Sequence, residues 1–275
     1  MAGQFTGISD SVWAIIETYL PTTTVPPTRG RPHASFRKVI NTILGVLLTG
    51  ARWVDVPRGE NFASRSTAHR WLGLWESDGT WANLQAHLLG EAQELGLIDW
   101  ERASIDSSFA AGKGGGEGVQ YGFKGKGVNL HTVVEGKGLP LAIISTGAAD
   151  SERAQVAPLL DSIQILTGKP GRPKQLPAAL QADKGYDSRE LRTHLRTRGV
   201  KPLIPRRSWP HRKPFRGRPP AQPIDRWKVE RTFAWCQRKY RRLVVRWERR
   251  EKYWNGFISL AICMFWIDRL NGILG

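Results

Sequence analysis

The sequence predicts an α/β fold in which a run of helices precedes a segment of alternating strands and helices. Residues 1–100 contain apolar side chains at helical spacing and no clear strand pattern. From residue 102, short strand-like runs alternate with glycine-rich turns and helical segments, in the order typical of α/β proteins. We expect a helical N-terminal domain over residues 1–100 and an α/β domain over residues 101–275. With 275 residues and 40% hydrophobic content, the chain can bury a sizeable core.

Two helices are predicted first. Ser9 or Asp10 is a suitable cap for a short helix, which ends before the proline-rich linker at residues 21–32. Ser35 is expected to open the second helix, and Gly50 to end it.

A pair of helices about a short turn follows. Ser66 or Thr67 is predicted to cap a helix that runs through Leu74, and another helix is expected from about Thr80 to Leu95. Two interpretations stay open. The pair is either a reader of a DNA end that resembles a helix-turn-helix, or an ordinary helical hairpin. The first would use Arg65, His69 and Arg70, and the second would bury Trp71, Trp75 and Trp81.

The second half begins with a strand at residues 102–109 and a glycine-rich segment at 110–127. The glycine run 112–118 lacks the Gly-Lys-Ser/Thr ending of a phosphate-binding loop, so we expect a flexible surface loop. Strands are predicted at 128–136 and 139–146, then a helix capped by Ser151. A strand within 178–188, a helix around 189–198, a short strand at 200–207 and final helices complete the pattern. A basic, proline-rich loop is expected within 201–224.

Positive charge is concentrated in one part of the chain. The formal net charge is +17, yet residues 1–100 hold 8 Lys/Arg against 9 Asp/Glu, whereas residues 184–250 hold 22 against 5. Such a field suits a polyanion, above all nucleic acid, and the aromatic residues of the loop can stack on bases. The alternative is that these basic residues form a solvated face without a partner, and that Lys184 is simply exposed to solvent. The predicted DNA contacts from this block are Lys184, Arg206, Arg207, Arg212, Lys213, Arg216 and Arg218.

Several classes of protein are disfavoured. Cys236 and Cys263 are far apart and outside any Cys-x-x-Cys pair, which argues against a disulfide framework or a structural zinc site. The N-terminus lacks the features of a signal peptide. The apolar run 257–270 is too short to span a bilayer. We therefore expect a cytoplasmic, nucleoid-associated protein without a membrane partner.

Three acidic residues occupy unusual positions. Asp106 lies inside a strand-like run, Asp183 ends an apolar strand, and Glu230 lies beside the apolar stripe of a helix. Convergent carboxylates suit Mg²⁺, which prefers hard oxygen ligands and acts in pairs on phosphodiesters. His131, in contrast, is predicted to be a hydrogen-bonded strand histidine, and Asp187 a helix cap rather than an extra ligand.

Three segments carry a resemblance to a known family. ASIDSS, QADKGYDS and DRWKVERTFAWCQRKYRRL resemble, in order and spacing, the DDE transposases of bacterial insertion sequences, above all the insertion-sequence-five family, a relative of the insertion-sequence-four family. HTVVEGKGLPL, GARWVDVP and STAHRWLGLWESDGTW are also similar to that group. The resemblance implies an RNase H-like catalytic core in which Asp106, Asp183 and Glu230 hold two Mg²⁺ ions, with Mn²⁺ as a substitute. It also implies cleavage at terminal inverted repeats of double-stranded DNA, strand transfer into target DNA, and a homodimer or larger assembly on DNA.

The family's tail motif is matched in part. It reads Tyr, two residues, Arg, three residues, Glu, six residues, Lys; Arg226 and Glu230 match, whereas Pro223 and Gln237 depart. On a continuous helix Gln237 would still face the DNA, and Arg241, eleven residues after Glu230, would replace the missing lysine. Arg226, Gln237 and Arg241 therefore join the predicted DNA contacts.

Three other functions fit parts of the sequence. They are a simple metal-dependent nuclease, a catalytically silent or repurposed sequence-specific DNA-binding protein, and a basic RNA-binding structural protein. The three placed acids favour the transposase over the last two.

Overall fold

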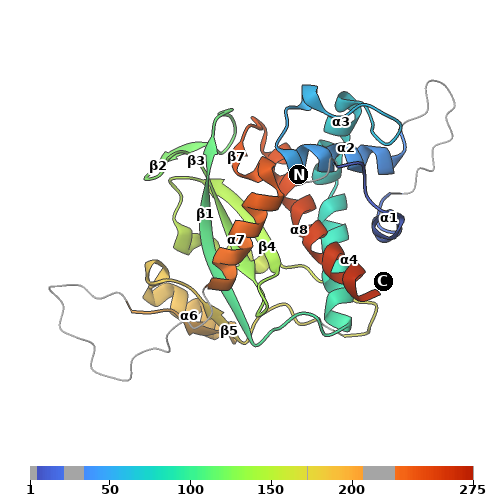
Figure 1. Cartoon of the computed structure of the whole chain (residues 1–275). Helices are drawn as coiled ribbons and strands as arrows, with labels where there is room; N and C mark the ends of the chain where they lie inside the picture. Colours follow the sequence, from blue (N-terminus) through green and yellow to red (C-terminus); the bar gives the residue numbers. More distant parts are fainter. Residues whose placement is uncertain (1–4, 22–33, 172, 207–226, 275) are drawn as a thin grey trace.

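A computed structural model describes residues 5–21, 34–171, 173–206 and 227–274 (Figure 1). Four helices come first, with a short 3-10 turn, η1 (Trp53–Asp55), between the second and third. The helices are α1 (Asp10–Glu17), α2 (Phe36–Thr49), α3 (Arg65–Ser77) and α4 (Thr80–Glu94).

The ends of these helices follow local sequence signals. The Ser9 hydroxyl accepts from the Val12 amide at 3.3 Å, and Gly50 ends α2 with a φ of 71°, as predicted. The predicted start of α3 is wrong. Its cap is Ser64, whose hydroxyl accepts from the Thr67 amide at 3.2 Å, in place of Ser66 or Thr67.

In the described part of the second half, seven strands form a mixed sheet. The strands are β1 (Arg102–Gly112), β2 (Gln120–Gly122), β3 (Gly125–Val134), β4 (Pro140–Gly147), β5 (Ala179–Gln181), β6 (Lys201–Leu203) and β7 (Val245–Arg246). Its main path is β4–β3–β1–β5–β6; β4, β3 and β1 run antiparallel, and β5 and β6 run parallel to β1. The short β2 pairs with β3, and β7 with the end of β1. This arrangement, after an N-terminal helical region, is the predicted RNase H-like architecture.

Helices cover the two faces of the sheet. They are η2 (Glu152–Gln155), α5 (Val156–Asp161), η3 (Lys184–Tyr186), α6 (Arg189–Thr197), α7 (Trp227–Lys239), η4 (Arg241–Leu243) and α8 (Glu251–Leu274). Gln237 of α7 bonds Ser108 of β1, and Trp254 of α8 bonds Ser145 of β4. Both serines pair with Leu130 in register, so α7 and α8 lie on the same face. The next residue, Ser107, points to the other face and contacts Glu152.

One hydrophobic core joins the N-terminal helices to the sheet. Trp75 and Trp81 are fully buried and pack edge to face, with ring centroids 5.2 Å apart. Helix α8 packs against both α3 and α4, and buries Trp254 and Trp266 between these helices and β4. The buried tryptophans favour the helical hairpin over an open DNA reader. The division at residue 100 stays a prediction.

The glycine-rich loop after β1 lies at the surface, as predicted, but its backbone packs closely on the segment before α8. The Glu117 amide donates to the Arg249 carbonyl at 2.8 Å. A Cβ on Gly114 or Gly116 would lie 2.2 or 2.1 Å from a carbonyl oxygen of the segment before α8. Glycine is therefore required here for close backbone packing. Among the described residues, no helix is both long and apolar enough to cross a bilayer.

His131 is the hydrogen-bonded strand histidine that was predicted. It is fully buried in β3, and its Nε2 lies 2.8 Å from the Thr146 hydroxyl. Burial lowers the pKa of its imidazole to about 4, although the nearby Glu152 and Asp150 act in the opposite direction.

The histidine should make the fold sensitive to acid. Unfolded His131 takes up a proton near pH 6.5, whereas the native imidazole resists protonation until about pH 4. Native stability should therefore fall by about 3 kcal/mol as the pH drops from 6.5 to 4. Urea unfolding of the wild type and His131→Gln across that range measures the effect, since the variant lacks this contribution. Parallel pH profiles for the two proteins would contradict it.

Candidate active site

Asp106 and Asp183 occupy equivalent positions on neighbouring parallel strands. The last residue pair between β1 and β5 is Ser104 with Gln181, and each aspartate lies two residues beyond it. Asp183 continues the extended backbone of β5, with φ −75° and ψ 173°. Adjacent strands are about 4.8 Å apart, and residues two apart share a face. The register therefore brings the two carboxylates side by side at the end of β5.

Local hydrogen bonds orient both carboxylates. Asp106 Oδ1 accepts from the Ser107 amide at 2.8 Å, and Asp183 Oδ1 accepts from the Gly185 amide at 2.7 Å. Both aspartates are half-buried. An ionised carboxylate offers about four lone-pair sites, so one accepted N–H bond is compatible with metal ligation. The Asp183 bond also caps η3, which places the exposed Lys184 immediately after the carboxylate.

Glu230 reaches the same face of the sheet from α7. Seven residues later, Gln237 points in nearly the same direction and donates to the Ser108 hydroxyl at 3.3 Å. Seven helical residues rise about 10 Å, the length of about three strand residues. Near its start, α7 places Lys228 beside Ser104 in a common cavity. The helix thus runs along β1 and brings Glu230 close to the level of Asp106.

The strand register brings the two aspartates side by side, but the described residues do not form a metal site with three ligands. Within the described residues, no three His, Cys, Asp or Glu side chains are near enough to one another to hold a metal ion. Glu230 itself is exposed on α7. The predicted trio therefore shares one face of the sheet, but its three carboxylates do not form a cluster close enough to hold a metal ion.

Three further residues, Ser107, Glu152 and Tyr186, belong to this environment and were not predicted. The Ser107 hydroxyl donates to Glu152 Oε1 at 2.6 Å, which ties β1 to η2 directly beside Asp106. The buried Tyr186 lies in the field of Glu152, Asp106 and Asp183. Its burial, and then these carboxylates, raise the pKa of the phenol well above its usual range. The Tyr186 hydroxyl lies near Ser107 but makes no well-formed hydrogen bond within the described residues.

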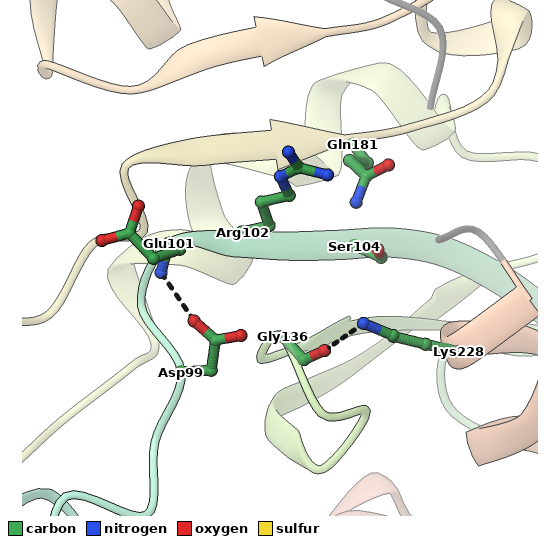
Figure 2. Close-up of a pocket in the computed structure, with 7 residues that line it drawn as sticks. All are labelled: Asp99, Glu101, Arg102, Ser104, Gly136, Gln181 and Lys228. Carbon is green, nitrogen blue, oxygen red and sulfur yellow. Dashed lines mark hydrogen bonds between the residues drawn. The ribbon is translucent and has the colours of Figure 1, made fainter. Parts of the chain in front are cut away.

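A cavity of about 210 Å³ opens next to the aspartate pair, at the start of β1. Figure 2 shows Ser104 and Gln181, one pleat before the two aspartates, on its sheet side. Lys228 donates to the Gly136 carbonyl at 2.5 Å, and Asp99 accepts from the Glu101 amide at 3.0 Å. Positively and negatively charged side chains therefore line a cavity on the face of the sheet that carries the candidate site.

Asp187 is not the helix cap that was predicted. The cap of α6 is Ser188, whose hydroxyl accepts from the Leu191 amide at 3.0 Å. Asp187 instead forms an ion pair with the buried Arg192, with 2.7 Å between the carboxylate and guanidinium. Through this ion pair Asp187 links the end of η3 to α6.

The continuous helix assumed for Arg241 is also wrong. Helix α7 ends at Lys239; Tyr240 leaves the helical conformation with φ −110° and ψ 72°, and Arg241 begins the separate turn η4. Tyr240 is fully buried and packs edge to face on Phe265, which fixes this break. Arg241 lies against Gly50 at the end of α2, and Lys239 is paired with Asp268. The helical-phase argument for Arg241 as a substitute for the missing lysine no longer holds.

The basic loop lies largely outside the described residues. Arg206, just after β6, is described and exposed. Arg207, Arg212, Lys213, Arg216, Arg218, Pro223 and Arg226 lie outside them.

A mixed sheet with two aspartates at equal register on parallel strands, crossed by a helix bearing a glutamate, defines a candidate nucleic-acid phosphoryl transferase. The family described as "Transposase DDE domain" matches residues 93–266, and the chain belongs to this family. Residues 8–85 match the family described as "Putative transposase of IS4/5 family". These two matches confirm the resemblance to DDE transposases of the IS4/IS5 type.

Individual sequence relatives agree with this assignment. The chain is 40% identical over 138 residues to the "Putative transposase for insertion sequence element IS402" of Burkholderia cepacia, a match that covers 50% of this chain and 62% of the relative. It thus spans less than two thirds of that relative's length. It is 37% identical over 116 residues to the "Insertion element IS402 uncharacterized 16.2 kDa protein" of the same organism, covering 40% and 76% of the two chains. A solved piggyBac transposase synaptic complex with hairpin DNA is 12% identical, with a TM-score of 0.49, covering 98% of this chain and 73% of that one.

Proposed function

We propose that this chain cuts DNA at the ends of its own element and joins the freed ends to target DNA. The observation that carries the proposal is the equal register of Asp106 and Asp183 on β1 and β5, beneath the helix that bears Glu230. Membership of the DDE transposase family supports it.

The donor set suits a hard divalent cation. Mg²⁺ prefers oxygen ligands and retains several waters, so a few carboxylates suffice. We assign Asp106 to both metal positions, and Asp183 and Glu230 to one position each, with Mn²⁺ as a substitute ion. When bound, two such ions stabilise the attacking and leaving oxygens of a phosphodiester.

The protein's own task is to hold the reacting DNA. In the first step water attacks the scissile phosphorus, the bond to the 3′ oxygen breaks, and a 3′-hydroxyl and a 5′-phosphate result. In the second step that hydroxyl attacks a target phosphodiester and displaces the target's own 3′ oxygen. We assign Lys184, which is exposed beside Asp183, to a phosphate that flanks the scissile bond. Two ends must be held together for the second step, so we expect at least a homodimer on DNA.

DNA binding should depend strongly on salt. We expect replacement of the six basic residues at positions 206, 207, 212, 213, 216 and 218 by Gln to reduce the slope of log affinity against log salt by about 0.9 for each phosphate that the loop no longer neutralises. Fluorescence anisotropy with labelled duplex DNA, at salt concentrations on both sides of the physiological value, provides the measurement. A matched variant with an equal number of lysines or arginines replaced elsewhere controls for total charge. An unchanged slope would remove this loop from the DNA interface.

A cleavage and joining assay tests the function itself. The substrate is a duplex that carries the terminal inverted repeat from the genomic DNA flanking the gene, incubated with Mg²⁺ or with EDTA. We expect metal-dependent release of a 3′-hydroxyl end and its appearance in a second, differently labelled duplex. Cleavage without joining would indicate a simple nuclease. Binding without cleavage in either Mg²⁺ or Mn²⁺ would indicate a catalytically silent DNA-binding protein.

A further inference from the structure

The hairpin of β2 and β3 presents the most exposed aromatic side chains of the described residues. Phe123 is 106% exposed and Tyr121 77%. Gly122 pairs with Gly125, so Phe123 and Lys124 form the two-residue turn at the tip. Figure 1 shows this hairpin projecting from the sheet, at the opposite end of β1 from β5. Aromatic rings held clear of the protein in this way are typical of an interaction surface.

The strands of the hairpin pack closely against their neighbours. A Cβ on Gly122 would lie 2.2 Å from the Ala148 carbonyl oxygen, and one on Gly127 would lie 2.3 Å from the Ala110 carbonyl oxygen. The Ala148 amide also donates to the Gly127 carbonyl at 3.3 Å. Turn positions favour glycine, asparagine and aspartate, so the turn itself gives no reason for a phenylalanine. A rigid stem therefore carries an aromatic tip that the fold does not need.

Positive charge surrounds the tip. Lys124 and Lys126 are exposed, and the Lys126 ammonium lies 5.7 Å from the Tyr121 ring centroid. The bond from Glu117 to the Arg249 carbonyl brings the segment before α8 alongside, where Trp247 is 53% exposed. We call these side chains the hairpin surface: Tyr121, Phe123, Lys124, Lys126, Trp247, Arg249 and Arg250. The hairpin surface combines exposed aromatic side chains with basic groups. In the glycine-rich loop and in the segment that leads into α8, the exposed acidic residues are Glu117 and Glu251.

The geometry points to a second DNA contact, made by the hairpin surface at a fixed distance from the scissile bond. We propose that the tip enters a groove of the duplex, with Phe123 against the bases and Lys124 and Lys126 on the flanking phosphates. This inference rests on the proposed function, which sets Asp106 at the scissile phosphate. Gly125 lies two residues beyond the pair of Ala111 with Gly127, seven strand residues from the level of Asp106. That span is about 23 Å, or about seven base pairs of duplex lying along β1.

Duplex DNA fits this surface better than a second copy of the chain. A two-stranded β-ribbon matches the width of the major groove, and apolar side chains at such a tip contact thymine methyl groups or wedge into a base step. A chain with a net charge of +17 would have to bring like charges together to self-associate through this basic surface.

A single reactive thiol at the tip tests the position of the contact. Cys236 and Cys263 are both buried, so Phe123→Cys introduces the one accessible thiol among the described residues, to which an iron–EDTA cleavage reagent can be attached. We expect strand scission centred about seven base pairs from the scissile phosphate of the terminal-repeat duplex. Leu95→Cys, on a residue 46% exposed at the end of α4, is the matched control. Scission no stronger than that of the control would overturn the proposal.

Affinity and assembly give an independent reading. Phe123→Ala should weaken binding to the same duplex about fivefold or more, and Phe123→Trp should restore it, since base–aromatic contacts are sequence-tolerant. If Phe123→Ala alters self-association without DNA and leaves DNA affinity unchanged, the surface is a protein interface and the proposal is wrong. The scission map needs only bound DNA, because its positions can be counted from the outer end of the terminal repeat. Suppose that wild-type protein binds the duplex, and that the tethered reagent cuts at the expected position, while the protein itself never cleaves DNA. That result would refute the proposed function and still support the hairpin contact.

Discussion

Asp106→Asn, Asp183→Asn and Glu230→Gln should each abolish cleavage of a terminal-repeat duplex while leaving its binding largely intact. The first two residues sit at equal register on β1 and β5, and the third is carried across them by α7. Each substitution replaces a charged oxygen ligand with a neutral amide of the same shape, so the fold and the DNA surface are retained. The loss should exceed the roughly 10- to 100-fold cost of removing a partner that only supports a metal ligand.

Single-turnover cleavage in Mg²⁺, measured with saturating protein, separates this loss from any change in affinity. Glu190→Gln, an exposed acid on α6 close to Asp183 in sequence, is the matched control and should cut at the wild-type rate. Glu152→Gln should lie between, because Glu152 acts through Ser107 rather than on the DNA. If a single variant of Asp106, Asp183 or Glu230 retains near wild-type cleavage, that residue is not part of the site.

Glu248→Ala should destabilise the protein by about 3–5 kcal/mol, the usual cost of breaking a buried ion pair by removing one partner. Arg242 donates to Glu248 Oε1 at 2.6 and 2.8 Å, with side chains only 6% and 3% exposed. The same guanidinium donates to the Ala51 carbonyl at 3.0 Å, just beyond the end of α2. Removal of Glu248 leaves a buried positive charge without its counter-ion at the junction between the N-terminal helices and the sheet.

Urea unfolding at neutral pH measures this cost. Replacing both partners by apolar residues, Arg242→Met with Glu248→Leu, should recover most of the stability, because the unpaired charge is then absent. Arg52→Ala, which breaks a solvent-exposed ion pair with Asp55, should cost far less than Glu248→Ala. Equal losses for Glu248→Ala and Arg52→Ala would contradict the role assigned to the buried pair.

The features that sequence predicted well are those with a local cause. Ser9 and Gly50 mark helix ends because each satisfies backbone groups within a few residues of itself. The alternation of strands and helices predicted the α/β order of the second half. Asp183 lies at the end of a strand, as the sequence indicated, and its role as a metal ligand stays a prediction. The start of α3 was missed because Ser64 lies near two other hydroxyl residues that have the same capping chemistry.

The features that sequence did not predict depend on contacts between distant segments. The end of α7 has no local signal, since burial of Tyr240 against Phe265 decides it. The link from Ser107 to Glu152 joins residues 45 positions apart, and the glycine loop is held by a segment more than 130 residues later. Composition alone therefore indicated a flexible loop where tertiary packing holds the backbone in place.

The position of α8 has a consequence for the newly made chain. Trp75 and Trp81 are enclosed by a helix that begins only at Glu251, 157 residues after α4 ends. At about 5–20 residues per second, a ribosome needs about 8–30 s to make that intervening stretch. During this time the faces of α3 and α4 that pack on α8 have no partner, so they are exposed to chaperones and proteases. Folding of the N-terminal helices is thus coupled to completion of the polypeptide, and a product that stops before α8 would lack a stable core at both ends.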